Sequence, residues 1–300
     1  MSIINDLNKV ITALITPFRE DFSLDEERYR EFIKFQIQNG CHLLTMGTTG
    51  ESATLSHNEH HNAIEITIDE VRKSEKKALV LAGTGSNSTK EAISLSKYAE
   101  NAGVHALLLV VPYYNKPVQH SLYDHFSKIA DSVSIPIILY NVPSRTGQNL
   151  EPATVSKLAY SKENIVGIKC ASGNIDQITQ IIKSTPEDFI VLSGDDSLTY
   201  HIMALGGKGV ISVASNIIPS KMVQFVDLMM RNDWQKAKKL HLEYYDLFKI
   251  LFIETNPGPV KYAAEIMNLM NRRMRLPLTP PIPENEHKIK KVLMDLDLIK

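Results

Sequence analysis

Short apolar runs alternate with helix-periodic segments along most of this chain, and this alternation restricts its fold more than any other feature. The apolar runs predict β-strands at residues 10–15, 43–46, 78–82, 106–111, 136–140, 165–169, 189–192 and 209–213. The helix-periodic segments lie at residues 25–38, 58–73, 89–101, 121–131, 152–159, 175–183, 198–205 and 220–232. Eight consecutive βα units favour a closed parallel (β/α)8 TIM barrel of the α/β class over an open doubly wound sheet.

The strand pattern ends near residue 233, and the rest of the chain is helical. We predict helices at residues 234–252, 260–270 and 283–298, with a proline-rich connector at 276–283. No repeat or linker divides the chain. We therefore predict a (β/α)8 barrel at residues 1–232 and a C-terminal helical extension at residues 233–300.

Charge and cysteine content exclude several classes of protein. The 300 residues carry a net charge of −1 with no long basic stretch, so neither a nucleic acid nor an acidic membrane surface is an expected partner. Cys41 and Cys170 lack metal-ligand spacing, which indicates reduced thiols in a cytoplasmic protein. Residues 1–18 lack the features of a secretory signal, and no apolar run has membrane-spanning length.

Lys169 stands in the otherwise apolar, β-branched run 165–170, near the carboxyl end of a predicted buried strand. Burial removes hydration and lowers the pKa of a lysine, which yields the neutral amine that carbonyl chemistry needs. The alternative is a lysine that pairs with a carboxylate or reaches water at the end of the strand. This segment alone does not separate the two interpretations.

The barrel prediction places chemistry at the carboxyl ends of strands and in the loops that follow them. Polar and glycine-rich segments follow four of the predicted strands, and they would converge with Lys169 on one mouth of the barrel. These segments are residues 47–51, 112–117, 140–147 and 193–196.

Each of these segments has a functional and an ordinary interpretation. The amides and hydroxyls around Thr48 and Thr49 can hold a carboxylate or phosphate, although an ordinary tight turn is the more common role. Two adjacent phenols, Tyr113 and Tyr114, suggest a proton path, whereas packing between subunits explains one of them.

Two further residues have equally open roles. Tyr140 ends the fifth predicted strand, where a phenol can act as a general acid or base or simply bind the backbone. Arg145 follows Pro143 among small residues, so its guanidinium is accessible to a substrate carboxylate. A surface salt bridge is the more common fate of a lone arginine.

Three other motifs are not assigned to a site. Residues 206–209 look like a phosphate-binding loop, but they precede the eighth strand and belong to the opposite face of a barrel. Residues 83–85 lack the third glycine of a dinucleotide fingerprint. His57, His60 and His61 lack the glutamate of a zinc-binding helix, so a solvated helix surface is the better interpretation and no metal is expected.

Together, these motifs resemble the dihydrodipicolinate synthase (4-hydroxy-tetrahydrodipicolinate synthase) family of pyruvate-dependent class I aldolases, which are related to N-acetylneuraminate lyase. The similarity runs from residues 12–18 to residues 254–261. Gly-Thr-Thr-Gly-Glu at 47–51 and Gly-Ile-Lys at 167–169 are typical of the whole group. Tyr-Tyr-Asn-Lys-Pro and Tyr-Asn-Val-Pro-Ser-Arg-Thr-Gly are more specific to the synthases, and the sialic acid lyases usually lack the arginine.

The resemblance implies a role for each matching residue. Lys169 would form a Schiff base with pyruvate, and Tyr140, Thr48 and Tyr114 would relay protons. The substrate-binding positions would be Thr48 and Thr49 for the pyruvate carboxylate, Gly194 and Ile211 for the pocket wall, and Arg145 for the carboxylate of L-aspartate 4-semialdehyde.

The resemblance also implies the reaction and the assembly. Pyruvate would condense with L-aspartate 4-semialdehyde on the diaminopimelate route to lysine, without a metal or an organic cofactor. In the family, the second tyrosine of the pair reaches into a neighbouring subunit. Tyr114 therefore implies a homo-oligomer, a tight dimer that usually pairs into a tetramer.

Many members of the family are inhibited by lysine at the dimer interface. The matching positions are Ser52, Ala53, Leu55, His57, His60, Asn87, Glu91 and Tyr113. Glu91 suits an ammonium group, Asn87 and Tyr113 suit a carboxylate, and His60 agrees with the lysine-sensitive pattern, so feedback inhibition is expected. Cys170 departs from the family, where glutamate is frequent, and strand alternation points it away from the side that Lys169 faces.

Two other functions stay open at this point. An aldolase that cleaves N-acetylneuraminate or a 2-keto-3-deoxy sugar acid would not need Arg145. A catalytically silent barrel that senses a keto acid or lysine would be expected to lose Lys169 or the tyrosines, and this chain retains them.

Overall fold

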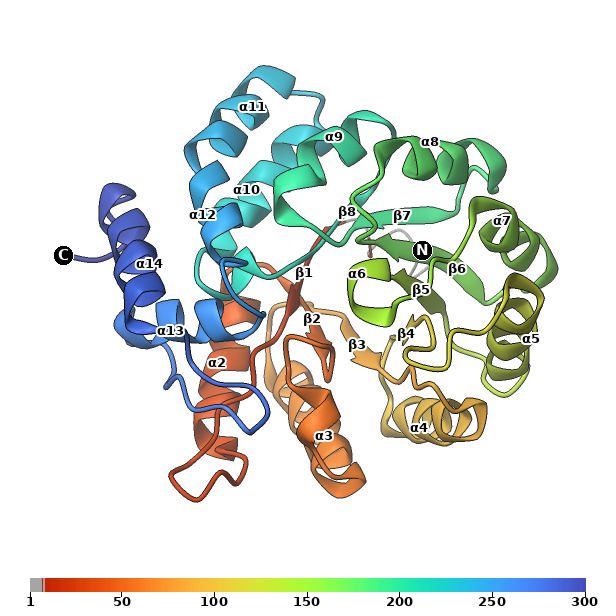
Figure 1. Ribbon diagram of the computed structural model, residues 1–300, viewed down its shortest axis with the longest axis horizontal. Helices are drawn as coiled ribbons and strands as arrows, with labels where there is room; N and C mark the ends of the chain where they lie inside the picture. The colour runs from red at the N-terminus through yellow and green to blue at the C-terminus, as the bar shows by residue number, and fades with distance from the viewer. Residues whose placement is uncertain (1–6, 8) are drawn as a thin grey trace. The chain divides into compact units, whose positions relative to one another are not determined.

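The structure is a computed structural model that describes residue 7 and residues 9–300. Its eight strands pair in chain order and close into a barrel, so the predicted (β/α)8 fold is confirmed (Figure 1). The strands are β1 (Val10–Ala13), β2 (His42–Thr45), β3 (Val80–Gly83), β4 (Ala106–Val110), β5 (Ile137–Asn141), β6 (Ile165–Cys170), β7 (Ile190–Ser193) and β8 (Gly209–Ser212). Each predicted strand therefore exists. Part of the segment considered for a secretory signal, residues 1–6 and 8, lies outside the described residues.

The helices follow the strands as predicted, with two differences. They are α2 (Glu26–Gln38), α3 (His57–Lys73), α4 (Thr89–Ala102), α5 (Gln119–Ala130), α6 (Pro143–Thr146), α7 (Pro152–Ser161), α8 (Ile175–Ser184), α9 (Thr199–Ala204), α10 (Pro219–Met230), α11 (Trp234–Glu243), α12 (Tyr245–Ile250), α13 (Gly258–Ile266) and α14 (Pro283–Asp295). The helix predicted at 234–252 is divided, because Tyr244 leaves the helical conformation at ψ 5°. The loop expected after β5 contains the short helix α6.

Side chains fix the starts of several helices. Asp25 accepts a hydrogen bond from the Arg28 amide at the start of α2. Ser56 forms a complete capping box with Glu59 at the start of α3. Ser88 accepts from the amide of Glu91 at the start of α4, but the Glu91 carboxylate is bound by the Ser86 hydroxyl. Each contact satisfies a backbone amide that a helix leaves unpaired.

The described chain divides into two compact units. The first unit consists of residue 7, residue 9 and residues 79–211. Its parallel strands β3 to β7 pair in order, and α4, α5, α7 and α8 pack against one another in sequence outside them (Figure 1). Leu107, Leu109, Ile138, Ile168 and Leu192 are fully buried in its core.

The second unit consists of residues 10–78 and 212–300. Here β1 pairs with β2 in parallel, α2 packs on α3, and α10 packs on both β1 and α11. The last helices belong to this packing, since α12 and α13 both contact α14. Within the described residues, no helix combines the length and apolar character that crossing a membrane requires.

Candidate active site

Lys169 on β6 lies beside Tyr140 on β5. The strand register pairs Tyr140 with Lys169 and Lys169 with Leu192, so these side chains leave the same face of the sheet. The Nζ atom of Lys169 is 4.2 Å from the centre of the Tyr140 ring. Lys169 is only 6% exposed. The amine therefore does not reach bulk water. This excludes the interpretation of Lys169 as a lysine that extends into water at the end of its strand.

Burial lowers the pKa of Lys169 from 10.5 to about 7. The cause is loss of hydration, which penalises the ammonium form. Two charges act on it in opposite directions, because Asp196 raises this pKa and Arg145 lowers it. At pH 8 a lysine with this pKa is about 90% neutral amine, the form that attacks a carbonyl carbon.

Asp196 begins the 3-10 turn η2 (Asp196–Leu198), which is separated from β7 by two residues, and it is buried. Asp195 caps this turn by accepting from the amide of Ser197 at 2.8 Å. The hydroxyl of Ser193 donates to the carbonyl of Asp195 at 2.7 Å. The sequence predicts residues 193–196 at the site but predicts no role for Asp196. Two adjacent carboxylates after a buried strand were the signal for it.

Gly194 lies directly after β7 and Ile211 lies on β8, the two strands that follow β6 around the barrel. The Gly194 amide donates to the carbonyl of Cys170 at 2.7 Å, and a Cβ atom there would stand 2.8 Å from the Cβ of Ala171. Only glycine fits that contact. Ile211 is buried two residues after Gly209, which pairs with Leu192. Ile211 therefore faces the same side of the sheet as Leu192 and Lys169.

Cys170 does not add a second reactive group. It is a free, buried thiol, and burial raises its pKa to about 12. Cys41 is likewise free and buried, with a pKa also raised to about 12. Both thiols stay protonated at neutral pH, so they behave as packing residues.

Arg145 is carried by α6, which starts at Pro143 and positions the loop after β5. The Thr146 hydroxyl donates to the carbonyls of Val142 at 3.2 Å and Gln148 at 2.8 Å, which holds this turn in one conformation. The Arg145 side chain is exposed. It is nevertheless close enough to influence the pKa of Lys169. A cation beside the amine suits the binding of an anionic substrate.

Tyr114 projects away from its own chain. Tyr114 is 89% exposed, and its backbone has a φ of 74°, which a tyrosine rarely adopts. Tyr113 is 40% exposed, and its carbonyl accepts from the side chain of Asn87 at 3.2 Å. Asn115 in turn donates to the carbonyl of Asn87 at 2.9 Å. The loop is therefore held from the β3–α4 connection, with Tyr114 presented outward.

Thr48 and Thr49 belong to a tight turn of the second unit, after β2. The amides of Gly50 and Glu51 donate to the carbonyls of Gly47 and Thr48, each at 3.1 Å. Thr48 is exposed and Thr49 is buried. The hydroxyl of Thr49 accepts from the side-chain amide of Asn256 at 2.9 Å. The turn thus has one accessible hydroxyl and one that the C-terminal segment orients.

A buried ion pair anchors the end of this turn. The Lys261 Nζ atom is 2.6 Å from a carboxylate oxygen of Glu51, and both side chains are fully buried. Lys261 also donates to the carbonyls of Thr16, at 2.8 Å, and Arg273. The sequence patterns predict neither this pair nor the contact of Asn256. A lysine inside the apolar segment 260–264 was the available signal, but it does not reveal the partner.

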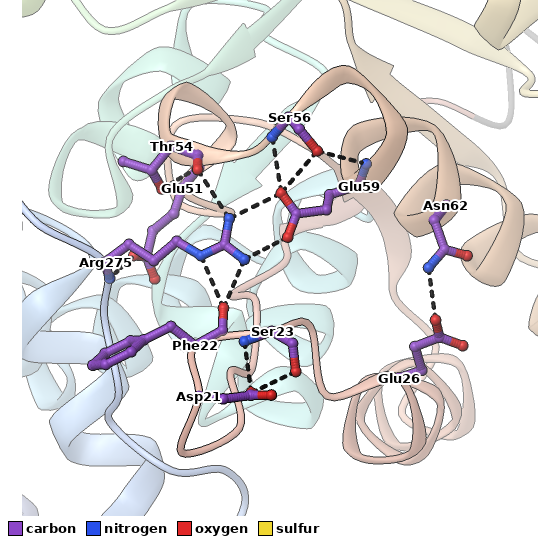
Figure 2. Close-up of polar contacts among 10 residues, drawn as sticks. All are labelled: Asp21, Phe22, Ser23, Glu26, Glu51, Thr54, Ser56, Glu59, Asn62 and Arg275. Carbon is purple, nitrogen blue, oxygen red and sulfur yellow. Dashed lines mark hydrogen bonds and ion pairs between the residues drawn. The ribbon is translucent and has the colours of Figure 1, made fainter.

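Arg275 joins three segments of the second unit beside this turn (Figure 2). Its guanidinium donates to the carbonyls of Phe22 and Thr54 and to the carboxylate of Glu59. Its backbone amide donates to Glu51 at 3.3 Å. The contact with Arg275 lowers the pKa of Glu59 to about 2, because the carboxylate is stabilised by the adjacent cation. The C-terminal segment thus holds the turn 47–51 and the start of α3 together.

The residues expected to bind lysine occur in two groups. Ser52 and Ala53 lie in the 3-10 turn η1 (Ser52–Thr54), and Leu55, His57 and His60 lie between that turn and the first part of α3, all within the second unit. Asn87, Glu91 and Tyr113 lie in the first unit. Within the first group, His60 is buried and its ring packs edge-on against His61 at 6.2 Å. Within the second group, Asn87 and Tyr113 are in direct contact.

Comparison with known proteins gives one consistent family. A family model described as the dihydrodipicolinate synthetase family matches residues 6–296. The 4-hydroxy-tetrahydrodipicolinate synthase of Sulfurihydrogenibium sp. is 49% identical over 292 residues, covering 97% of this chain and 98% of the relative. The crystal structure of dihydrodipicolinate synthase from Aquifex aeolicus matches with a TM-score of 0.94 at 46% identity, over 97% of this chain and 98% of that chain. The enzyme from Cyanidioschyzon merolae, crystallised with lysine bound, matches with a TM-score of 0.94 at 38% identity, over 97% of this chain and 98% of that chain.

Proposed function

This chain belongs to the dihydrodipicolinate synthetase family, and from that premise we propose how its residues carry out the reaction. The reaction is the condensation of pyruvate with L-aspartate 4-semialdehyde, which makes the chain a Schiff-base-forming lyase of the diaminopimelate route to lysine. Our proposal assigns the imine to Lys169. The observation that carries this assignment is a buried lysine with a pKa of about 7 packed against Tyr140.

The neutral Nζ atom of Lys169 attacks the ketone carbon of pyruvate, and the ketone oxygen leaves as water. The resulting iminium draws electrons from the neighbouring methyl group, which loses a proton and becomes an enamine. The enamine carbon forms a bond with the aldehyde carbon of L-aspartate 4-semialdehyde. The aldehyde oxygen takes the π electrons of its carbonyl and a proton to become a hydroxyl, and the iminium on Lys169 forms again. The amine of this second substrate then attacks the iminium carbon, which closes the ring and releases Lys169.

Several of these steps move protons, and Tyr140 is our candidate for the transfer. The Tyr140 ring packs against the Lys169 amine, and the two residues are paired on neighbouring strands of the sheet. A phenol exchanges protons effectively when polar partners adjust its pKa. We assign the partner roles to Thr48 and to Tyr114 of a neighbouring subunit.

The two substrates each carry a carboxylate, and we assign one site to each. Thr48 and Thr49 bind the carboxylate of pyruvate through hydroxyls and backbone amides. Gly194 and Ile211 line the space around the reacting carbons. Arg145, with its exposed guanidinium on α6, binds the carboxylate of L-aspartate 4-semialdehyde.

We propose a homo-oligomer built from tight dimers, with a dimer of dimers as the complete assembly. The support is Tyr114, an aromatic side chain that its own chain leaves 89% exposed. Two neighbouring aromatic residues on a loop are typical of an interface. A sedimentation experiment on the Tyr114→Ala variant tests this assignment. Dissociation of the dimer or loss of activity with the dimer retained supports it, and unchanged assembly with unchanged activity contradicts it.

We also propose feedback inhibition by lysine, in a cytoplasmic enzyme whose extension 233–300 follows a barrel 1–232. The support for inhibition is the set of polar residues around η1, α3 and Tyr113, together with the relative from Cyanidioschyzon merolae that was crystallised with lysine. Activity is measured against increasing lysine. No effect up to millimolar concentrations contradicts the proposal.

The decisive test of the imine uses pyruvate and borohydride. Reduction traps the adduct as a secondary amine, and mass spectrometry of the digested protein identifies the modified residue. We expect the mass increase on the peptide that contains Lys169 and none in the Lys169→Ala variant. The absence of any adduct would instead favour a catalytically silent sensor.

A second test separates the synthase from a sugar-acid aldolase. Product formation from pyruvate and L-aspartate 4-semialdehyde is measured beside cleavage of N-acetylneuraminate. The Arg145→Ala variant should raise the KM for L-aspartate 4-semialdehyde, because a charge-assisted carboxylate contact is lost. Unchanged kinetics in this variant, with cleavage of the sugar acid, would favour the aldolase.

A further inference from the structure

The proposed pyruvate-binding turn is attached to the C-terminal segment by two side chains around the start of α13. Asn256 lies two residues before this helix and donates to the Thr49 hydroxyl at 2.9 Å. Lys261 lies in the first turns of the same helix and pairs with Glu51 at 2.6 Å. All four residues are buried. The short segment from Asn256 to Lys261 therefore holds both the residue that would bind substrate and the end of its turn.

The chemistry of the Asn256 contact determines what the Thr49 hydroxyl can do. A threonine hydroxyl has one hydrogen to donate and two lone pairs that accept. The amide nitrogen of Asn256 can only donate, so it occupies a lone pair of the Thr49 oxygen. The Thr49 hydrogen is thereby left for another acceptor. A carboxylate is a strong acceptor, and a hydroxyl that already accepts one hydrogen bond donates a better one.

The turn itself is held in a conformation that it would not adopt alone. Met46 and Glu51, which flank residues 47–50, both have left-handed backbones with φ of 55° and 57°. Such strain in residues other than glycine persists only where the surroundings impose it, and it gathers at functional sites. The Glu51–Lys261 pair and the Asn256 contact hold Glu51 and Thr49 within this turn.

We propose that Asn256 is a positioning residue for the reaction, which orients the Thr49 hydroxyl so that its hydrogen points to the carboxylate of pyruvate. This inference rests on the proposed function of the turn. Asn256 acts through Thr49 and does not itself need to touch pyruvate. Its removal should therefore weaken the binding of pyruvate more than it slows the chemical steps.

The Asn256→Asp variant tests the role with almost no change in shape. An ionised aspartate only accepts, so it takes the Thr49 hydrogen and places a negative charge beside the carboxylate site. We expect the KM for pyruvate to rise about 10- to 100-fold, with a smaller change in kcat and no change in the KM for L-aspartate 4-semialdehyde. The control is Asn271→Asp, which adds the same charge where the side chain already accepts from the amide of Arg273 at 3.1 Å.

A double-mutant cycle separates positioning from simple support of the fold. Asn256→Ala should raise the KM for pyruvate several-fold alone, but less than twofold when Thr49 is already Val. Additive effects of the two changes would overturn the proposal. So would a lower melting temperature of Asn256→Ala with an unchanged KM for pyruvate. If Asn256→Asp does not fold, the alanine cycle still decides the question.

Borohydride trapping of the wild-type protein distinguishes failure of this inference from failure of the proposed function. A wild-type adduct on Lys169 together with an unchanged KM in Asn256→Asp refutes only the role of Asn256. The absence of any wild-type adduct refutes the imine assignment, and the inference about Asn256 then falls with it.

Discussion

Two buried lysines, Lys169 in the first unit and Lys261 in the second, show how different surroundings give one side chain different properties. Lys261 is fully buried and donates to a carboxylate and to two backbone carbonyls. Three acceptors match the three hydrogens of an ammonium group. Lys169 instead lies against the ring of Tyr140 and has a pKa of about 7.

Burial lowers the pKa of both lysines, but the charges that oppose this effect differ in proximity. Glu51 is in direct contact with Lys261 and counters the lowering of its pKa. Asp196 raises the pKa of Lys169 only as a neighbouring charge, and Arg145 works against it. A carboxylate in contact with a buried lysine keeps it as a structural cation. A buried lysine that contacts an aromatic ring instead of a carboxylate loses its proton more easily and can act as a nucleophile.

The largest expected effect concerns activity at Lys169. Lys169→Ala should lower kcat by about 1,000-fold or more, because the imine cannot form without the Lys169 amine. Product formation under saturating substrates measures this loss. Lys183→Ala, a change on α8 outside the site, serves as the control and should keep normal activity. Substantial turnover by Lys169→Ala would show that Lys169 is not the reactive lysine.

Replacement of each lysine by methionine should change stability in opposite directions. Lys261→Met leaves the Glu51 carboxylate buried without its cation and should lower the free energy of unfolding by about 3–5 kcal/mol. The double variant Lys261→Met, Glu51→Gln should recover part of that loss. Lys169→Met removes a lysine that resists protonation, and it should raise the free energy of unfolding by about 1–3 kcal/mol at pH 6.

The sign of the Lys169 effect follows from its pKa values in the two states. The lysine has a pKa near 10.5 when unfolded and about 7 when folded, so the unfolded protein binds more protons between these values. The wild type therefore becomes more stable as pH rises from about 7 to 10.5, and the advantage of Lys169→Met shrinks over that range. Urea unfolding at pH 6, 8 and 10 measures the trend. A difference in the free energy of unfolding between Lys169→Met and the wild type that stays constant with pH would contradict this prediction.

The pH dependence of catalysis should report the same group. The value of kcat/KM for pyruvate should rise about fivefold between pH 6 and pH 7 and level off above about pH 8, as the free amine becomes the main form. The Asp196→Asn variant should shift the midpoint to lower pH, because Asp196 raises the pKa of Lys169. A flat profile between pH 6 and 8 would remove Lys169 as the titrating group.

The smallest expected effect concerns Arg275 and Glu59. Arg275→Met should lower the free energy of unfolding by about 1–3 kcal/mol at pH 7, because a partly buried ion pair is lost. Glu59 has a folded pKa of about 2, so its contribution is present above pH 4.5 and is lost as pH falls toward 2. The difference in the free energy of unfolding between Arg275→Met and the wild type should therefore become smaller as the pH falls from 5 to 3.

A matched arginine gives the control for this last prediction. Arg273 pairs with Glu20 at 3.0 Å, but the Glu20 side chain is 90% exposed. Arg273→Met should change the free energy of unfolding by less than about 0.5 kcal/mol, since exposed ion pairs contribute little. Equal losses in Arg273→Met and Arg275→Met would show that burial does not distinguish the two pairs.

Local pattern was sufficient for the strands, because each short apolar run must be buried and alternates with one helix. It also located Lys169, since a charged residue inside such a run is visible without any knowledge of its neighbours. It was insufficient for α6, whose four residues are too few to show a helical period, and for the break at Tyr244, where no glycine or proline marks the end of the helix. Periodicity describes the face that a segment buries and not the residue where packing ends it.

The sequence by itself determined the (β/α)8 order of elements and the place of Lys169 inside an apolar strand, because both depend on residues close together in the chain. Tertiary structure alone decided which lysine is structural and which is reactive. The partners of Lys261 and Thr49 lie 210 and 207 positions away, at Glu51 and Asn256. No local pattern encodes such pairings, since desolvation and counter-charges are properties of the folded neighbourhood.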